Sequence, residues 1–473
     1  MKPKNLVFLM TDQQRADTLG MTACGRPVTP HLDRLAAQSA VFRRAYDACP
    51  LCVPARTALA TGRSPLSNGM MLNDLPGRYA RDNPTLHRLL AENGWDVAHI
   101  GVAHISVKPP LRHSLPFAAW ECDDTYAEAM KHKGISLSRA PEDSVMVEEL
   151  GDGRYRPHRY SNARVSLWEH PLEDFKDVWF ASRAVDFLDR PHPRPFALFL
   201  YLWAPHPPLI VPAGYLRRFP YEQIPLPANT DRPCPGEPDG YRRGAAAQLG
   251  LHPPEKGWRQ AWSAHLALAN LCDEQCGRIL QALRRNGLEQ DTLVVFTTDH
   301  GEQLGQHGMY QKMEMYEPAV RVPALFHLPG GPACTLETPI SHLDFVPTVT
   351  DLLGLPGLPG AEGLSLAPSV RSGCEPLPHD VFGVYCGNHA YGDMRRMIVR
   401  ANWKYVFDGN GEELYDLDRD PLEMQNLASS RACAGIRAEL RLALASYCAE
   451  RGDPLFRTDG AGAPPFAAPR QPL

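Results

Sequence analysis

The stretch FALFLYLWAPHPP, residues 196–208, is an almost unbroken apolar run that ends in a proline-rich loop. A run of this length that stops at a turn signal is typical of a strand buried on both faces of a sheet. Residues Thr292–Thr298 have the same character, and helical patterns separate the apolar runs along the chain. We therefore predict an α/β fold, with a large doubly wound, mostly parallel sheet flanked by helices.

The pattern changes after about residue 370, where several short extended runs precede a last helical segment. We predict a catalytic α/β domain over residues 1–370 and a C-terminal subdomain over residues 371–473, with a small antiparallel sheet and a helix. Two stretches, 109–170 and 213–257, show little periodicity. We expect them to be long loops that shape a substrate pocket.

Four polar residues each follow the end of a predicted strand: Asp12, His104, His206 and Asp299. In an open α/β sheet, ligands bind in the crevice outside the carboxyl ends of the strands. These residues are therefore candidates for one functional site.

The stretch CVPARTALATGR, residues 52–63, carries a candidate nucleophile. Pro54 suits the first position of a helix, where its missing N–H group costs nothing. We expect the turn after Cys52 to begin a helix from Ala55 to about Ala60. The free N–H groups at its start would face a reacting anion.

This stretch resembles the sulfatase signature, Cys-x-Pro-Ser/Ala-Arg followed by Thr-Gly-Arg. From about residue 5 to 430 the chain resembles the type I, formylglycine-dependent sulfatases of the alkaline phosphatase superfamily. The resemblance implies that a formylglycine-generating enzyme oxidises Cys52, and that the hydrated aldehyde attacks the sulfur of a sulfate ester. A covalent sulfated intermediate then releases sulfate, so two easier steps replace one. Arg56 would hydrogen-bond the nucleophile and the metal-bound oxygens.

The same resemblance assigns four metal ligands, together with the oxygen of modified Cys52: Asp12, Gln13, Asp299 and His300. Ligands that are mostly oxygen favour Ca²⁺ or Mg²⁺. One imidazole and one amide move the preference slightly towards Mn²⁺. We expect one divalent metal, with Ca²⁺ favoured, that lowers the pKa of the nucleophile and polarises the sulfuryl oxygen.

Three further residues receive catalytic roles from the resemblance. His206 lies in a Pro-His-x-Pro loop and would donate a proton to the bridging oxygen, because the pKa of histidine lies near neutrality. Lys312, downstream of Asp299, would contact sulfate and assist the leaving group; the family's preceding glycine is Gln311 here. His104 ends a segment that resembles the family's Gly-Lys-x-His, and would be the base that releases sulfate.

The largest departure from the family is Val102, which stands where a lysine usually binds the sulfate oxygens. Either Lys108 or another cation replaces that lysine, or the anion is held more weakly or differently. Some phosphonate and phosphodiester hydrolases of the superfamily also differ at this segment. The interpretation is thus a sulfatase acting on a small-molecule or saccharide sulfate ester. The alternatives are a phosphonate monoester or phosphodiester hydrolase with the same nucleophile, and an inactive relative that binds sulfated ligands.

Composition restricts the partners. The chain has 473 residues, a net charge of −5 and no apolar run long enough to span a bilayer, so we expect neither nucleic acid nor a membrane as partner. The apolar run near Met1 stops at Thr11 and is shorter than a signal peptide requires, which favours a cytoplasmic protein. A homo-oligomer is compatible with the sequence.

Overall fold

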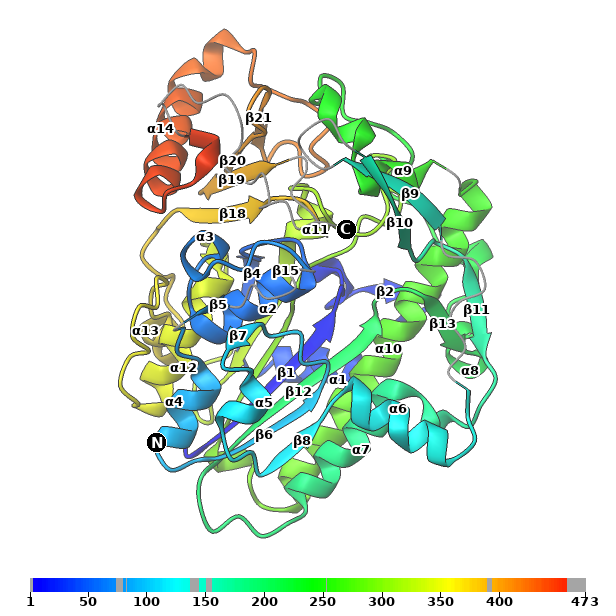
Figure 1. The fold of residues 1–473 in the computed structure, drawn as a ribbon, viewed down its shortest axis with the longest axis vertical. Coiled ribbons are helices and arrows are strands. Elements are labelled where there is room, and N and C mark those ends of the chain that lie inside the picture. Colours follow the sequence, from blue (N-terminus) through cyan, green and yellow to red (C-terminus); the bar gives the residue numbers. More distant parts are fainter. Residues whose placement is uncertain are drawn as a thin grey trace, which may run out of the picture.

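A mixed nine-stranded sheet forms the centre of the computed structural model, which describes residues 3–73, 80–81, 83–136, 144–149, 155–251, 253–388 and 394–456 (Figure 1). The strand order is β16-β4-β15-β14-β1-β12-β6-β8, with β17 beside β4. The bounds are β1 (Asn5–Asp12), β4 (Ala40–Tyr46), β6 (Asp96–Gly101), β8 (Ala119–Glu121), β12 (Phe196–Pro205), β14 (Thr292–Thr298), β15 (Arg321–His327), β16 (Cys334–Leu336) and β17 (Ile340–Ser341).

The strands β14, β1, β12, β6 and β8 run parallel, and β15 joins β14 antiparallel. Successive side chains of a strand point to opposite faces of the sheet. Accordingly, Leu6 and Phe8 of β1 pack into one hydrophobic core and Val7 and Leu9 into the other. Because both faces are covered, the central strands are apolar at almost every position. The predicted doubly wound α/β fold is confirmed.

Helices cover both faces of this sheet (Figure 1). One core contains side chains of α1, α7 and α10, and the other contains side chains of α2, α4, α12 and α13. The longer helices are α1 (Pro30–Ala36), α2 (Cys52–Thr61), α4 (Leu86–Glu92), α6 (Asp123–His132), α7 (Lys176–Leu188), α10 (Glu255–Arg285), α12 (Phe345–Leu353) and α14 (Ala434–Glu450). Shorter ones are α3 (Pro65–Asn68), α5 (Leu111–Ser114), α8 (Ala213–Leu216), α9 (Ala245–Gly250), α11 (Glu317–Val320) and α13 (Ala367–Ser372).

A four-stranded antiparallel sheet forms the C-terminal part, with α14 beside it in Figure 1. Its strands are β18 (Val381–Tyr385), β19 (Arg395–Arg400), β20 (Trp403–Phe407) and β21 (Glu412–Asp416). Buried ion pairs join it to the larger part of the chain: Arg395 to Glu314 at 2.8 Å and Lys404 to Glu317 at 3.2 Å. The domain boundary at residue 370 stays a prediction, and the segment 457–473 lies outside the described residues.

The structure corrects two expectations. Helix α2 begins at Cys52 itself, because the N–H group of Ala55 already bonds the carbonyl of Leu51 at 2.9 Å. Pro54 is the third residue of the helix, where an N–H group would still lack an intrahelical partner. The two stretches expected to be loops also contain regular elements, including β8, α6 and β11 (Val165–Trp168) in the first, and α8 and α9 in the second.

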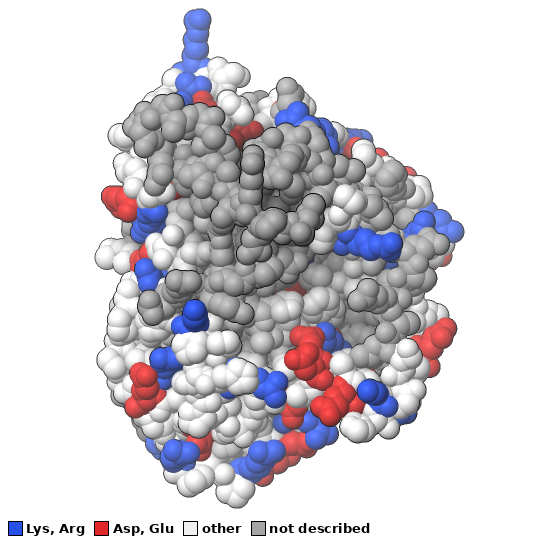
Figure 2. Space-filling model, in the orientation of Figure 1, with Lys and Arg blue, Asp and Glu red and all other residues white. Residues whose placement is uncertain are grey.

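No helix among the described residues is long and apolar enough to cross a membrane. On the face shown in Figure 2, cationic and anionic side chains are interspersed over the described surface.

Candidate active site

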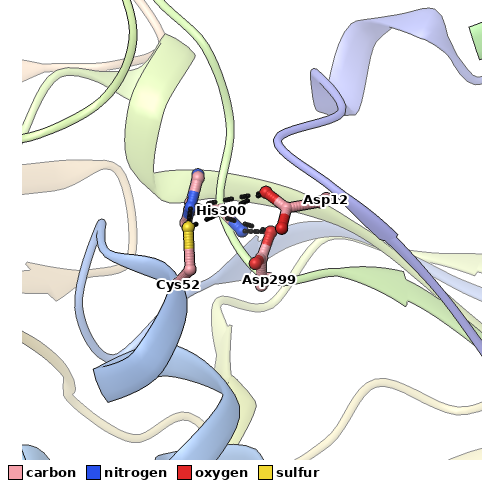
Figure 3. A group of neighbouring side chains, drawn as sticks. All are labelled: Asp12, Cys52, Asp299 and His300. Atoms are coloured by element: carbon pink, nitrogen blue, oxygen red, sulfur yellow. Dashed lines mark hydrogen bonds and ion pairs between the residues drawn. The ribbon is translucent and has the colours of Figure 1, made fainter. Parts of the chain in front are cut away.

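Four side chains from three separate segments point towards one another at the carboxyl end of the sheet (Figure 3). Asp12 ends β1, Asp299 and His300 follow β14, and Cys52 is the first residue of α2. One ligand atom from each lies within 4.8 Å of the others, and all four residues are buried. The structure thus brings together the candidate nucleophile and three of the four predicted metal ligands.

Arg56, one turn after Cys52, fixes the two carboxylates. Its Nε donates to Asp299 at 2.8 Å and its Nη2 to Asp12 at 2.7 Å, while its Nη1 donates to the carbonyl of Val102 at 2.8 Å. All of these atoms lie away from solvent, so the charge-assisted bonds are strong and directional. We expected Arg56 to hydrogen-bond the nucleophile and the metal-bound oxygens. In the structure it bonds the two carboxylates proposed to hold the metal, and its bond to the nucleophile stays a prediction.

The imidazole of His300 has the tautomer that a metal ligand needs. Its Nδ1 lies 3.1 Å from the carbonyl oxygen of Gly301, a group that can only accept a hydrogen bond. The proton is therefore assigned to Nδ1, which leaves the lone pair on Nε2. Nε2 faces the group, 3.2 Å from the sulfur of Cys52. Burial lowers the pKa of His300 to about 4, so the ring is neutral at pH 7.

The donor set fits a divalent cation. Burial, with the charge of Asp299 beside it, raises the pKa of Asp12 to about 7, so a further positive charge at this group would stabilise the carboxylate of Asp12. Two ligand atoms on opposite sides of an ion, each at about 2.4 Å, are separated by about 4.8 Å. The ligand atoms of the four side chains all lie within this distance of one another. Two carboxylates and one neutral imidazole are also ordinary ligands for such an ion.

Gln13 lies next to this group and is held by both ends of its amide. Its Nε2 donates to the carboxylate of Glu302, and its Oε1 accepts from the ammonium of Lys312 at 2.5 Å. Glu302, which was not predicted from the sequence, therefore fixes which end of the amide faces the site. The role of Gln13 as a metal ligand stays a prediction.

His206 and Lys312 form a hydrogen-bonded pair at the same site. The carbonyl of Pro207 contacts Nδ1 of His206, so the ring accepts from Lys312 at Nε2, 2.8 Å away. Burial and the charge of Lys312 lower the pKa of His206 well below its usual value. In this arrangement Lys312 donates and Nε2 of His206 accepts. The role of His206 as the general acid stays a prediction.

His104 and Val102 follow β6. His104 is solvent-exposed, has a φ of 33°, and its ring centroid lies 6.3 Å from that of Trp203. Val102 is fully buried and its carbonyl is bound to Arg56, so the segment contributes backbone rather than a cation. Gly101 is required here, since an added Cβ would lie 1.8 Å from the carbonyl oxygen of Tyr201. Lys108, the suggested replacement for the lysine, has an exposed side chain.

Two asparagines, which the sequence did not indicate, hold the start of α2. Asn73 accepts from the N–H group of Val53 at 3.1 Å and donates to the side chain of Asn388 at 2.9 Å. One of the N–H groups expected to face the anion is thus already bonded. Asn388 belongs to the C-terminal part, so that part contributes to the placement of the residue beside Cys52.

Comparison with the profiles of known protein families shows to which family the chain belongs. The profile of the sulfatase family matches residues 4–355, and the profile described as N-sulphoglucosamine sulphohydrolase, C-terminal, matches residues 305–450. The first match covers most of the chain. The protein therefore belongs to the sulfatase family, within the alkaline phosphatase superfamily, and is a sulfuric ester hydrolase.

Individual relatives are distant but similar over their full length. The uncharacterized sulfatase YidJ of Escherichia coli K12 is 28% identical, with 97% of this chain and 89% of that protein covered. An arylsulfatase of Clostridium perfringens is 27% identical, with 91% of each covered. The phosphonate monoester hydrolase SpPMH from Silicibacter pomeroyi has the same fold, with a TM-score of 0.76, 22% identity, and 95% of this chain and 96% of that chain covered.

Proposed function

We propose that this protein is a formylglycine-dependent sulfatase that hydrolyses an organic sulfate ester. The observation that carries the proposal is the position of Cys52, buried among Asp12, Asp299 and His300 at the carboxyl end of the sheet. The signature around Cys52 and the family support its conversion to formylglycine, whose hydrate supplies the nucleophilic oxygen. That conversion requires a formylglycine-generating enzyme as a maturation partner.

Asp12, Asp299, His300 and Gln13 would hold one divalent metal, for which the carboxylate and amide oxygens favour Ca²⁺. Bound there, the metal would supply charge that lowers the pKa of the nucleophile and withdraws electrons from the sulfuryl group. Arg56 keeps one oxygen of each carboxylate occupied, and so directs the remaining oxygens towards Cys52. Glu302 holds the amide of Gln13, so that its oxygen faces the site.

Lys312 and His206 would assist the departure of the alcohol leaving group. Lys312 lies between Gln13 and His206, within hydrogen-bonding distance of both. His206, as the neutral acceptor, orients the ammonium. The pair can thus stabilise or protonate the bridging oxygen. His104, exposed at the edge of the site, would be the base in the release of sulfate.

A phosphonate monoester or phosphodiester hydrolase is the second candidate. It is favoured by the buried Val102, because the lysine expected to bind sulfate oxygens is absent there. The kinetic test uses enzyme with its metal bound and residue 52 modified, and compares kcat/KM for an aryl sulfate, a phosphodiester and a phosphonate monoester. We expect the sulfate ester to have the highest value. A higher value for a phosphorus ester would favour the second candidate, and no turnover would indicate an inactive relative.

The pairing of Lys312 and His206 predicts how substrates respond to their loss. For Lys312→Met and His206→Gln, we expect kcat/KM to fall by about 10²- to 10⁴-fold for aryl sulfates with poor leaving groups, because proton donation is then most needed. For sulfate esters of activated phenols, kcat/KM should fall much less. The kcat/KM of the double variant should be only slightly lower than that of the less active single variant, since the two side chains act as one unit.

Assays across a series of substituted aryl sulfates measure this effect. His132→Gln is the control, because that histidine is exposed on α6. An equal loss for every leaving group would mean that Lys312 and His206 only position the anion.

A further inference from the structure

Lys176, the first residue of α7, lies at the edge of the site described above. Its ammonium nitrogen lies over the ring of Trp203, 4.4 Å from the centroid. Two histidines with proposed catalytic roles also lie near Trp203: its ring centroid lies 4.2 Å from that of His206 and 6.3 Å from that of His104. An aromatic face is a favourable place for a cation, and Trp is the strongest of the three aromatic residues in this respect. The ammonium of Lys176 and the rings of both histidines thus surround one indole, that of Trp203.

The second partner of Lys176 is Asp123, the first residue of α6, with which it forms an ion pair. Both side chains are partly exposed, Lys176 at 22% and Asp123 at 41%. An ion pair that water can reach contributes little to stability. Lys176 can therefore exchange Asp123 for another anion at small cost, while Trp203 keeps the ammonium in place.

The charge of Lys176 also reaches the site, where it is among the charges that act on His104 and Asp12. Lys108 is less suited to this role, since its side chain is exposed on β7 (Val107–Lys108). The chain thus places a cation near the two histidines although residue 102 is valine.

We propose that Lys176 binds the anionic group of the substrate on the side of the site lined by His104 and His206, in place of the lysine that is absent at residue 102. Asp123 holds Lys176 while no anion is bound and competes with the anion for it. The proposal rests on the proposed function and adds a residue that determines affinity and specificity.

Two variants with opposite expected effects test the proposal. Lys176→Met should raise the KM for an aryl sulfate, and the inhibition constant of inorganic sulfate, by about ten- to a hundredfold, since a charge-assisted hydrogen bond is lost. Asp123→Asn should lower the same inhibition constant, because it releases Lys176 from its competing partner. If the pair were only structural, both variants would change activity in the same direction.

Lys133→Met is a matched control. Lys133, just after α6, forms an ion pair with Asp174, just before α7. Like the pair of Lys176 and Asp123, this ion pair connects the two helices. We expect this variant to bind sulfate as tightly as the enzyme without a substitution does. An unchanged inhibition constant in Lys176→Met, or a higher one in Asp123→Asn, would overturn the proposal.

A binding measurement separates this inference from the proposed function. Calorimetry with inorganic sulfate and inorganic phosphate on the metal-loaded protein needs no turnover. If the enzyme cleaves phosphodiesters rather than sulfate esters, the sulfatase proposal fails, yet Lys176→Met should still weaken phosphate binding. If it cleaves sulfate esters but Lys176→Met binds both anions as before, the proposal for Lys176 fails and the proposed function stands.

Discussion

Cys52→Ala is expected to abolish turnover, with kcat falling by about 10⁴- to 10⁶-fold, because no other residue of the site can supply the nucleophile. The structure supports this expectation through the position of Cys52 against His300 and Asp12. Without modification the residue would be a poor nucleophile, since burial and the charge of Asp12 raise the pKa of its thiol. Steady-state assays of purified variants measure the loss.

Cys49→Ala is the matched control for this experiment. Cys49 lies three residues earlier and is as buried as Cys52, with exposed fractions of 1% and 5%. A general effect of removing a buried sulfur should appear in both variants. A Cys52→Ala variant with near-normal turnover would exclude covalent catalysis at residue 52.

Asp299→Asn is expected to remove most of the bound metal and to lower kcat/KM by at least about 10³-fold, because an amide is a weaker ligand than a carboxylate for a divalent cation. The replacement keeps the shape of the side chain and an acceptor for the N–H groups of Gln13 and His300. Elemental analysis of the dialysed protein, alongside kinetics, measures both quantities.

Asp47→Asn provides the comparison. Asp47 follows β4, is fully buried, and its carboxylate has no hydrogen-bond partner among the described residues. Burial raises its pKa well above the usual value, which favours the neutral form that asparagine resembles. Asp47→Asn should retain metal and activity. Equal metal content in the two variants would mean that Asp299 is not a ligand.

The central sheet and the meeting of four residues could be predicted because they depend on local patterns. A strand buried on both faces must be apolar throughout, as in β12 and β14, and the residues just after its carboxyl end lie at the crevice. This reasoning places Asp12 and Asp299 together. The signature residues around Cys52 add the third segment.

The rest depends on contacts that no local pattern encodes. No local pattern showed that two buried carboxylates would bind the guanidinium of Arg56. Nor did any local pattern show that Lys312 would lie against Nε2 of His206. Both outcomes depend on which charges tertiary folding brings together.

Helix α6 was expected to be a loop, although its buried residues Tyr126 and Met130 have helical spacing.

The central claim is that residue 52 of the active enzyme is formylglycine. Peptide mass spectrometry of protein with measured turnover tests it most directly. Exchange of the sulfur and two hydrogens for one oxygen lowers the peptide mass by about 18 Da, and the hydrate restores the mass of one water. The account predicts that activity scales with the fraction of peptide carrying this change. Full activity from protein in which residue 52 is entirely an unmodified thiol would contradict the account.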